Sequence, residues 1–142
     1  MSSIRNHSES GQVAVLVLGL ALVAFAVAGI AVDGTRAFLY RRTLQNAADA
    51  AALSGAAEID QRDYYASGGE DVLIDEPAAR AEVRRMLGLR GIRVSATAAI
   101  DTGGVTVVLR GNVPTSFLGI VGIESIPVAV ESRAEPFPGD AP

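Results

Sequence analysis

The architecture of this chain is decided by residues 13–32, which read VAVLVLGLALVAFAVAGIAV. Twelve of these 20 residues are Val, Leu, Ile or Phe, and none of them is charged. A helix of about 20 residues extends for about 30 Å, which is the thickness of the hydrocarbon core of a bilayer. Each large apolar residue favours insertion by roughly 0.3–0.6 kcal/mol. The run therefore predicts a transmembrane helix in a single-pass membrane protein.

A cleavable signal peptide is the main alternative interpretation of this run. Ala24-Phe25-Ala26 and Ala26-Val27-Ala28 both fit the small-x-small cleavage pattern, and Arg5 supplies a positive charge ahead of the run. However, the run is longer than the usual apolar region of about 7–15 residues, and helical sequence continues beyond it. We therefore favour an uncleaved anchor, and a secreted protein left after cleavage is the alternative.

The whole chain predicts an α+β protein. The long N-terminal transmembrane helix continues past the membrane, and a small domain of one helix on a three-stranded antiparallel sheet follows. We divide the chain into a polar segment, the transmembrane helix, a helical extension, an acidic connector that we expect to be flexible, the small domain and a flexible tail. In that order, these parts are residues 1–12, 13–32, 33–59, 60–76, 77–135 and 136–142.

The helix of the small domain is predicted from its start signal and its apolar face. Pro77 follows two acidic residues, a pattern typical of a first helical turn. Gly88 or Gly91 is expected to end the helix. Apolar residues recur on one side of it with helical spacing. These residues are Ala79, Val83, Met86 and Leu87.

The strands are predicted from alternating apolar and polar residues. In residues 92–100 the apolar face consists of every second residue from Ile92 to Ile100. The loop Asp101–Gly104 predicts a hairpin in which glycine supplies a positive φ, and residues 105–113 form the return strand. A third strand is expected at residues 126–130, and Pro127 places it at an edge of the sheet. Before it, Thr115 or Ser116 is expected to cap a short helical turn.

Composition excludes several classes of function. The net charge of −4 argues against a nucleic-acid-binding protein, which needs a basic surface to neutralise phosphates. The chain has no Cys, and its one His, His7, precedes the apolar run. No Ser lies in a nucleophile-elbow motif. We therefore expect no enzyme, no catalytic residues, no cofactor, no metal and no small-molecule substrate.

Two features suggest helix packing instead of chemistry. Small residues recur along one side of the apolar run, at Ala21, Ala24, Ala28 and Ala31, and such residues let helices approach closely in lipid. Chance in an Ala-rich helix explains this stripe equally well. Beyond the run, Asp33 and Arg36 share a helical face and are expected to form a solvated ion pair at the membrane boundary.

The stretch Leu44-Gln45-Asn46-Ala47-Ala48-Asp49-Ala50-Ala51-Ala52-Leu53 is the most distinctive part of the helical extension. Together with Gly11-Gln12 before the run and Asp33-x-x-Arg36 after it, this stretch resembles the N-terminal region of TadE/TadG-like Flp pilus-assembly proteins. The resemblance covers about residues 8–57. It implies a bitopic, pilin-like component of a tight-adherence secretion system, whose C-terminal domain lies outside the cytoplasmic membrane. Related prepilins are cut after a Gly that precedes a Glu, but no Gly precedes Glu9 here.

The charges that flank the run give the opposite orientation. Arg36, Arg41 and Arg42 follow the run, whereas only Arg5 precedes it, so the positive-inside rule alone places the C-terminal domain in the cytoplasm. We follow the resemblance, because the family also carries basic residues after its span.

These features together predict a membrane-anchored structural or assembly component of a Flp/Tad-type pilus or secretion system. Its expected partners are the lipid bilayer, other components of that system and possible further copies of itself. An anchored accessory binding module or regulator is the alternative. The residues predicted to carry helix packing or assembly are Ala21, Ala24, Ala28, Ala31, Asp33, Arg36, Leu44, Gln45, Asn46, Ala47, Asp49, Ala50, Ala51 and Leu53.

Overall fold

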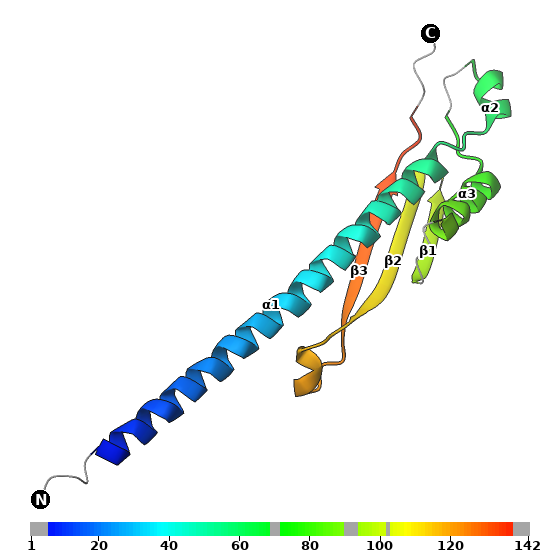
Figure 1. Cartoon of the computed structure of the whole chain (residues 1–142). Coiled ribbons are helices and arrows are strands. Elements are labelled where there is room, and N and C mark those ends of the chain that lie inside the picture. Colours follow the sequence, from blue (N-terminus) through cyan, green and yellow to red (C-terminus); the bar gives the residue numbers. More distant parts are fainter. Residues whose placement is uncertain (1–5, 69–71, 90–93, 102, 138–142) are drawn as a thin grey trace, which may run out of the picture. The chain divides into compact units, whose positions relative to one another are not determined.

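Figure 1 shows the computed structural model of the chain, which describes residues 6–68, 72–89, 94–101 and 103–137. Within these ranges the chain forms three α-helices, three strands and a 3-10 helix between the last two strands. The elements are α1 (Asn6–Ala56), α2 (Gln61–Ala66), α3 (Glu76–Leu89), β1 (Ser95–Asp101), β2 (Gly104–Pro114), η1 (Leu118–Val121) and β3 (Ser125–Ala134).

The chain divides into two compact units, which we describe separately. The anchor unit consists of Met1–Ala37 and Pro114–Ile126, and the sheet unit consists of Phe38–Val113 and Pro127–Pro142. Helix α1 contributes its N-terminal part to the first unit and its C-terminal part to the second.

The part of α1 in the anchor unit has the character of a membrane span. Between Gly11 and Ala56 the helix is long and apolar enough to cross a bilayer. Its large apolar side chains are exposed, including Leu18 at 63% and Phe25 at 59%. A helix that faces lipid needs such a surface, so the structure agrees with the predicted anchor.

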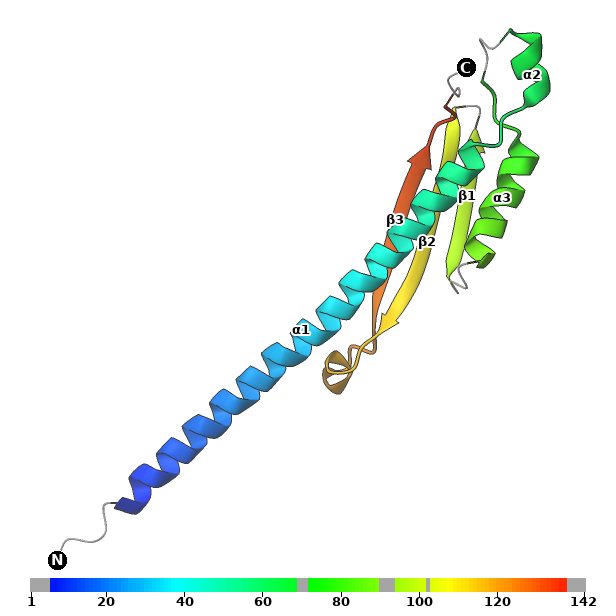
Figure 2. The same cartoon turned by 45° about the horizontal axis from the view of Figure 1, so that its top comes forward.

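The sheet unit contains the antiparallel sheet that the alternating pattern predicts. The strand order is β1-β2-β3, and β1 pairs with β2 from Ser95↔Arg110 to Asp101↔Gly104. Figure 2 shows β3 antiparallel to β2 on the other side. The third strand is therefore an edge strand, as Pro127 indicates.

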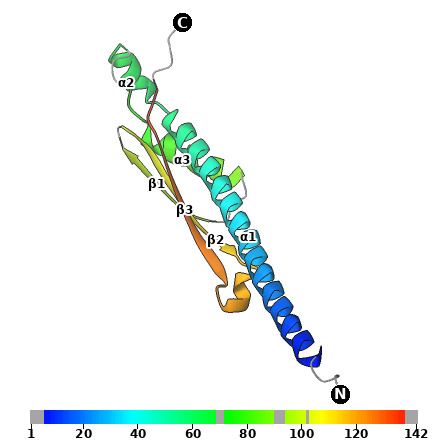
Figure 3. The same cartoon turned by 90° about the vertical axis from the view of Figure 1, so that its left-hand side faces the viewer.

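The core of the sheet unit lies between the sheet and two helices, whereas the sequence analysis assigned only one helix to this domain. The C-terminal part of α1 and α3 cover the same face of the sheet (Figure 3). Gly55 permits the close approach, because a Cβ atom there would lie 2.8 Å from Val83 Cγ2 and 3.3 Å from Val105 Cγ1. The predicted apolar face of α3 is confirmed: Ala79 and Val83 are buried, and Met86 and Leu87 pack against the core. The helical extension is thus part of the domain.

The predicted hairpin at Asp101–Gly104 is confirmed, but the role assigned to its glycines is wrong. Among the described residues, the glycines with a positive φ are Gly68 and Gly122. Gly104 is needed for space instead, since a Cβ there would lie 2.8 Å from the carbonyl oxygen of Ala134.

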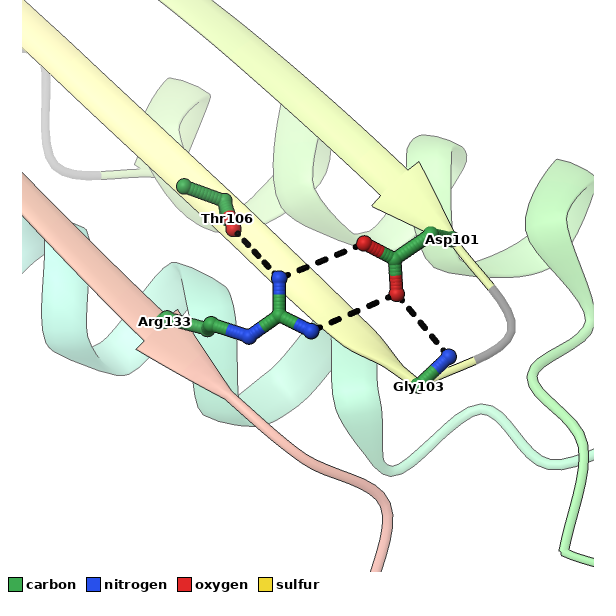
Figure 4. Close-up of polar contacts among 4 residues, drawn as sticks. All are labelled: Asp101, Gly103, Thr106 and Arg133. Carbon is green, nitrogen blue, oxygen red and sulfur yellow. Dashed lines mark hydrogen bonds and ion pairs between the residues drawn. The ribbon is translucent and has the colours of Figure 1, made fainter.

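The same hairpin carries a polar contact between edge strands (Figure 4). Arg133 Nη1 of β3 lies 3.2 Å from Asp101 Oδ2, and the Gly103 N–H donates to Asp101 Oδ1 at 2.9 Å. The Arg133 guanidinium, assisted by the Gly103 N–H, lowers the pKa of Asp101. The contact joins the ends of β1 and β3 across β2.

The acidic connector differs from the flexible segment that we expected. Its residues 61–66 form α2, because the Asp60 carboxylate caps that helix by accepting the N–H groups of Arg62 at 2.9 Å and Asp63 at 3.4 Å. An isolated antiparallel β-bridge between Ile59 and Ile74 joins the two ends of the connector.

Other expectations for the sheet unit need small corrections. Ala96 is exposed, although Val94, Ala98 and Ile100 of the same predicted face pack against the core. Helix α3 continues through Gly88 to Leu89. Ile92, Gly91 and the tail from residue 138 lie outside the described residues.

Candidate functional site

Asp33 forms the most specific polar contact of the anchor unit. Its carboxylate is 1% exposed, and it accepts hydrogen bonds from the backbone N–H groups of three consecutive residues. The distances are 2.9 Å from Ser116, 2.8 Å from Phe117 and 2.8 Å from Leu118. These residues lead into η1, so the carboxylate of one helix caps the start of another element more than 80 residues along the chain.

This arrangement corrects the prediction that Thr115 or Ser116 caps the helical turn. The residue at the start of η1, Phe117, makes no side-chain capping bond. Asp33 caps η1 instead. A carboxylate suits this role because it can accept hydrogen bonds from several N–H groups at once. The Leu118 N–H, followed by those of Ser116 and Phe117, lowers the pKa of Asp33, and burial opposes this. The group is therefore held as a carboxylate.

Arg36 does not form the predicted ion pair with Asp33. Its Nη1 donates to Ser116 Oγ at 2.5 Å, and among the ion pairs of the described residues none joins Arg36 to Asp33. The carboxylate of Asp33 is buried and accepts three backbone N–H groups, and Arg36 acts on it only as a nearby positive charge that also lowers its pKa. The two residues instead hold the same loop from neighbouring turns of α1.

Apolar contacts extend this docking along α1 into the predicted membrane span. The rings of Phe25 and Phe117 meet edge to face, with their centroids 5.6 Å apart. A Cβ atom at Gly29 would lie 2.7 Å from Phe117 Cβ, so only glycine lets the loop approach this closely. Figures 1 and 2 show the turn that contains η1 beside α1.

The loop is stabilised within itself as well. The Thr115 N–H donates to the Glu124 carbonyl at 3.0 Å, and the Ile123 N–H donates to the Leu118 carbonyl at 3.0 Å. Gly122 ends η1 with a φ of +88°, a conformation that glycine adopts without strain. We call residues Thr115–Glu124 the docking loop.

The four alanines predicted to pack against another helix in the membrane are exposed in this single chain. Ala21, Ala24, Ala28 and Ala31 are all exposed on α1, whereas Gly29, between them in the sequence, is buried by the docking loop. The stripe of alanines is therefore distinct from the surface that receives the loop.

The predicted residues of the Leu44–Leu53 stretch divide between core and surface. Leu44, Ala47 and Ala51 are fully buried in the sheet unit. Gln45 donates to Asp49 Oδ1 at 2.8 Å and to the Glu131 carbonyl of β3 at 3.1 Å. Of the remaining predicted residues, Asp49 and Ala50 are half-buried, and Asn46 and Leu53 are exposed.

The partner of Asp33 and the role of Gly29 were not predicted from the sequence. One signal pointed to them: the uncharged apolar stretch Phe117–Ile123 between two predicted strands. Across the described ranges, no three His, Asp or Glu side chains lie close enough together to hold a metal ion. What the site does is bind one segment of the chain to another at the end of the apolar run.

Comparisons with known proteins agree with the resemblance of the N-terminal region. A family model described as Flp pilus-assembly TadE/G-like matches residues 11–58. This range contains the whole apolar run and nearly all of the helical extension. A search of curated proteins and a search of solved structures give no significant match.

Proposed function

From the TadE/G-like character of residues 11–58, we propose that this protein is a membrane-anchored structural or assembly component of a Flp/Tad-type pilus or secretion system. It acts as a minor pilin-like subunit through contacts between helices and domains, and it performs no enzymatic reaction. Its C-terminal domain lies outside the cytoplasmic membrane. An anchored accessory module that never enters a filament is the second candidate.

The observation that carries the proposal is the double use of α1. One helix supplies an exposed apolar surface of membrane-span length and, further along, the buried core of the sheet unit. The family match covers both of these parts. A subunit that is held in a membrane and carries a folded domain needs both of these parts.

Exposed apolar residues of α1 outside the run support contacts with other proteins. Phe38 is 65% exposed, Leu39 is 55% exposed and Leu53 is 64% exposed. These side chains belong to the sheet unit, but because they are exposed, its own sheet does not cover them. A neighbouring subunit or assembly factor gains apolar contact by covering them.

Filament shearing tests the proposed role. Cells that carry the tagged full-length protein are sheared, and the filaments and the membranes are separated. A structural subunit co-sediments with the sheared filaments, whereas an accessory module stays with the membranes. Absence from both the filaments and any complex with other Tad components would contradict the proposal.

Protease treatment of wall-stripped cells tests the orientation. The connector at residues 60–76 contains exposed positions, and we expect it to be cut from outside while residues 13–32 stay intact. If the connector is protected while an external control protein is cut, the C-terminal domain is cytoplasmic.

A further inference from the structure

The docking loop presents apolar side chains that no described part of the chain covers. Ile120 is 75% exposed, Val121 is 72% exposed and Ile123 is 48% exposed. No charged residue lies between Ser116 and Ile123. Contiguous exposed apolar residues of this kind mark a surface that meets either a membrane or another protein.

The position of the loop on α1 identifies which of these it meets. Phe117 and Leu118 line an apolar cavity of 290 Å³ together with Leu22, Phe25 and Ile30 of α1. Leu22 lies 11 residues before Asp33, which corresponds to about 16 Å along the helix axis. The loop therefore lies beside the last three turns of the apolar run, and its exposed residues Ile120 and Val121 line the same cavity.

The hydrogen bonding of the loop fits this environment. In lipid each backbone polar group without a partner costs several kcal/mol, so a loop that meets lipid has to bond these groups within the protein. The N–H groups of Ser116, Phe117 and Leu118 donate to Asp33, and those of Ile120, Gly122 and Ile123 donate to carbonyls of the loop. The Thr115 hydroxyl donates to the Ile123 carbonyl. These N–H groups and the Thr115 hydroxyl are thus bonded within the protein, whereas Ile120, Val121 and Ile123 are exposed.

We propose that the docking loop is a second membrane-contacting element, in which Ile120, Val121 and Ile123 insert among the lipid acyl chains beside α1. The inference rests on the proposed anchoring of the chain by residues 13–32. Asp33 and Arg36 hold the base of the loop at the level of the headgroups, and Phe117 and Leu118 line the apolar cavity between the loop and the helix. In this arrangement α1 and the docking loop both contact the membrane. Two contacts instead of one restrict rotation of α1 about its own axis.

Quenching by spin-labelled lipid tests this contact. The chain has no Cys, so a single Val121→Cys variant of the full-length protein carries one environment-sensitive fluorophore after labelling. The protein is reconstituted in phosphatidylcholine vesicles, and the probes are a nitroxide on the lipid acyl chain and iodide in the water. We expect the label at position 121 to lose emission with the lipid nitroxide and to be protected from iodide.

Two leucines of α1 with nearly equal exposure provide matched controls. Leu18 is 63% exposed within the apolar run, and Leu53 is 64% exposed about 30 Å beyond the end of that run. A label at position 18 reports lipid, and a label at position 53 reports water. If position 18 is not quenched by lipid, the proposed anchor itself is wrong.

The remaining outcomes test only whether the docking loop contacts lipid. If position 18 is quenched by lipid but position 121 behaves like position 53, the loop lies in water and the inference fails. Protection of position 121 from both probes also overturns it, because a protein then covers the loop. An Asp33→Ala change should reduce lipid quenching at position 121 and leave position 18 unchanged, since the loop loses its three N–H contacts.

Discussion

Replacing Gly29 with Ala should detach the docking loop from α1. The new Cβ atom would lie 2.7 Å from Phe117 Cβ, 2.8 Å from Cγ and 2.9 Å from Cδ1, whereas unstrained carbon contacts begin at about 3.5 Å. Phe117 cannot relieve the overlap by rotating its ring, because its Cβ and Cγ atoms are fixed close to the backbone. The loop must therefore move outward by about 0.8 Å, and such overpacking costs about 1–3 kcal/mol.

The effect is measurable as hydrogen exchange in the loop. A free-energy change of about 1–3 kcal/mol corresponds to a roughly 5- to 150-fold change in the population of the open loop. We expect the N–H groups of Ser116, Phe117 and Leu118 to exchange faster by that factor in the full-length protein in lipid nanodiscs. These are the donors that bind Asp33, so their exchange reports the docking directly.

Gly19→Ala is the matched control for this change. Gly19 also lies in the apolar run of α1, but a Cβ atom there meets nothing within 4 Å. Both substitutions raise helix propensity by about 1 kcal/mol, so their difference isolates the contact with Phe117. Equal exchange in the two variants would refute the close approach at Gly29.

Three further predictions concern the core, the pH dependence and the membrane face. Leu44→Ala should lower the free energy of unfolding of the sheet unit by about 2–5 kcal/mol, because Leu44 is fully buried, and pulse proteolysis in urea with the protein in detergent measures this. Leu53→Ala, on the same helix but exposed, should change it little. The pKa of Asp33 is lower than its ordinary value of 3.8 when the loop is docked, so docking is fully stabilised above about pH 3.8 and weakens as the pH falls below it. The protection of the loop amides, taken relative to their intrinsic exchange rates at each pH, should fall with it. Replacing both Ala24 and Ala28 with Leu should reduce crosslinking to partners or to further copies in the membrane without preventing insertion.

Each of these predictions has a result that would contradict it. If the Leu44→Ala and Leu53→Ala variants are equally stable, Leu44 does not lie in the core. If the protection of the loop amides, taken relative to their intrinsic exchange rates at each pH, stays constant when the pH falls well below 3.8, the Asp33 carboxylate does not hold the loop. Val23→Leu and Val27→Leu change neighbouring positions on another side of α1. If they reduce crosslinking as much as the alanine replacements do, the alanine face has no special role.

Local patterns in the sequence predicted most of the fold. The uncharged apolar run, the face of α3 and the alternation around Asp101–Gly104 each depend on residues close together in the chain, so periodicity alone reveals them. Asp60 was missed as a cap because it lies among other acidic residues that mask its role. Its two capping bonds to Arg62 and Asp63 nevertheless turn part of the connector into a helix.

The candidate site was predicted less well, because it depends on contacts between distant parts of the chain. Ala47 and Ala51 were recognised as residues for close packing, but small residues suit any neighbouring surface and do not specify their partner. In the structure their partner is the chain's own sheet unit. Asp33 was recognised as a residue at the membrane boundary, but its three N–H donors lie 83 to 85 residues later, where no local pattern connects them to it.

That separation along the chain also sets an order of events during synthesis. A ribosome that adds about 5–20 residues per second needs roughly 4–17 s to progress from Asp33 to the segment that binds it. During that interval Asp33 has been made, but the three N–H groups that bind it have not. The apolar run is therefore complete before the docking loop is synthesised, and the loop joins α1 only in a late step.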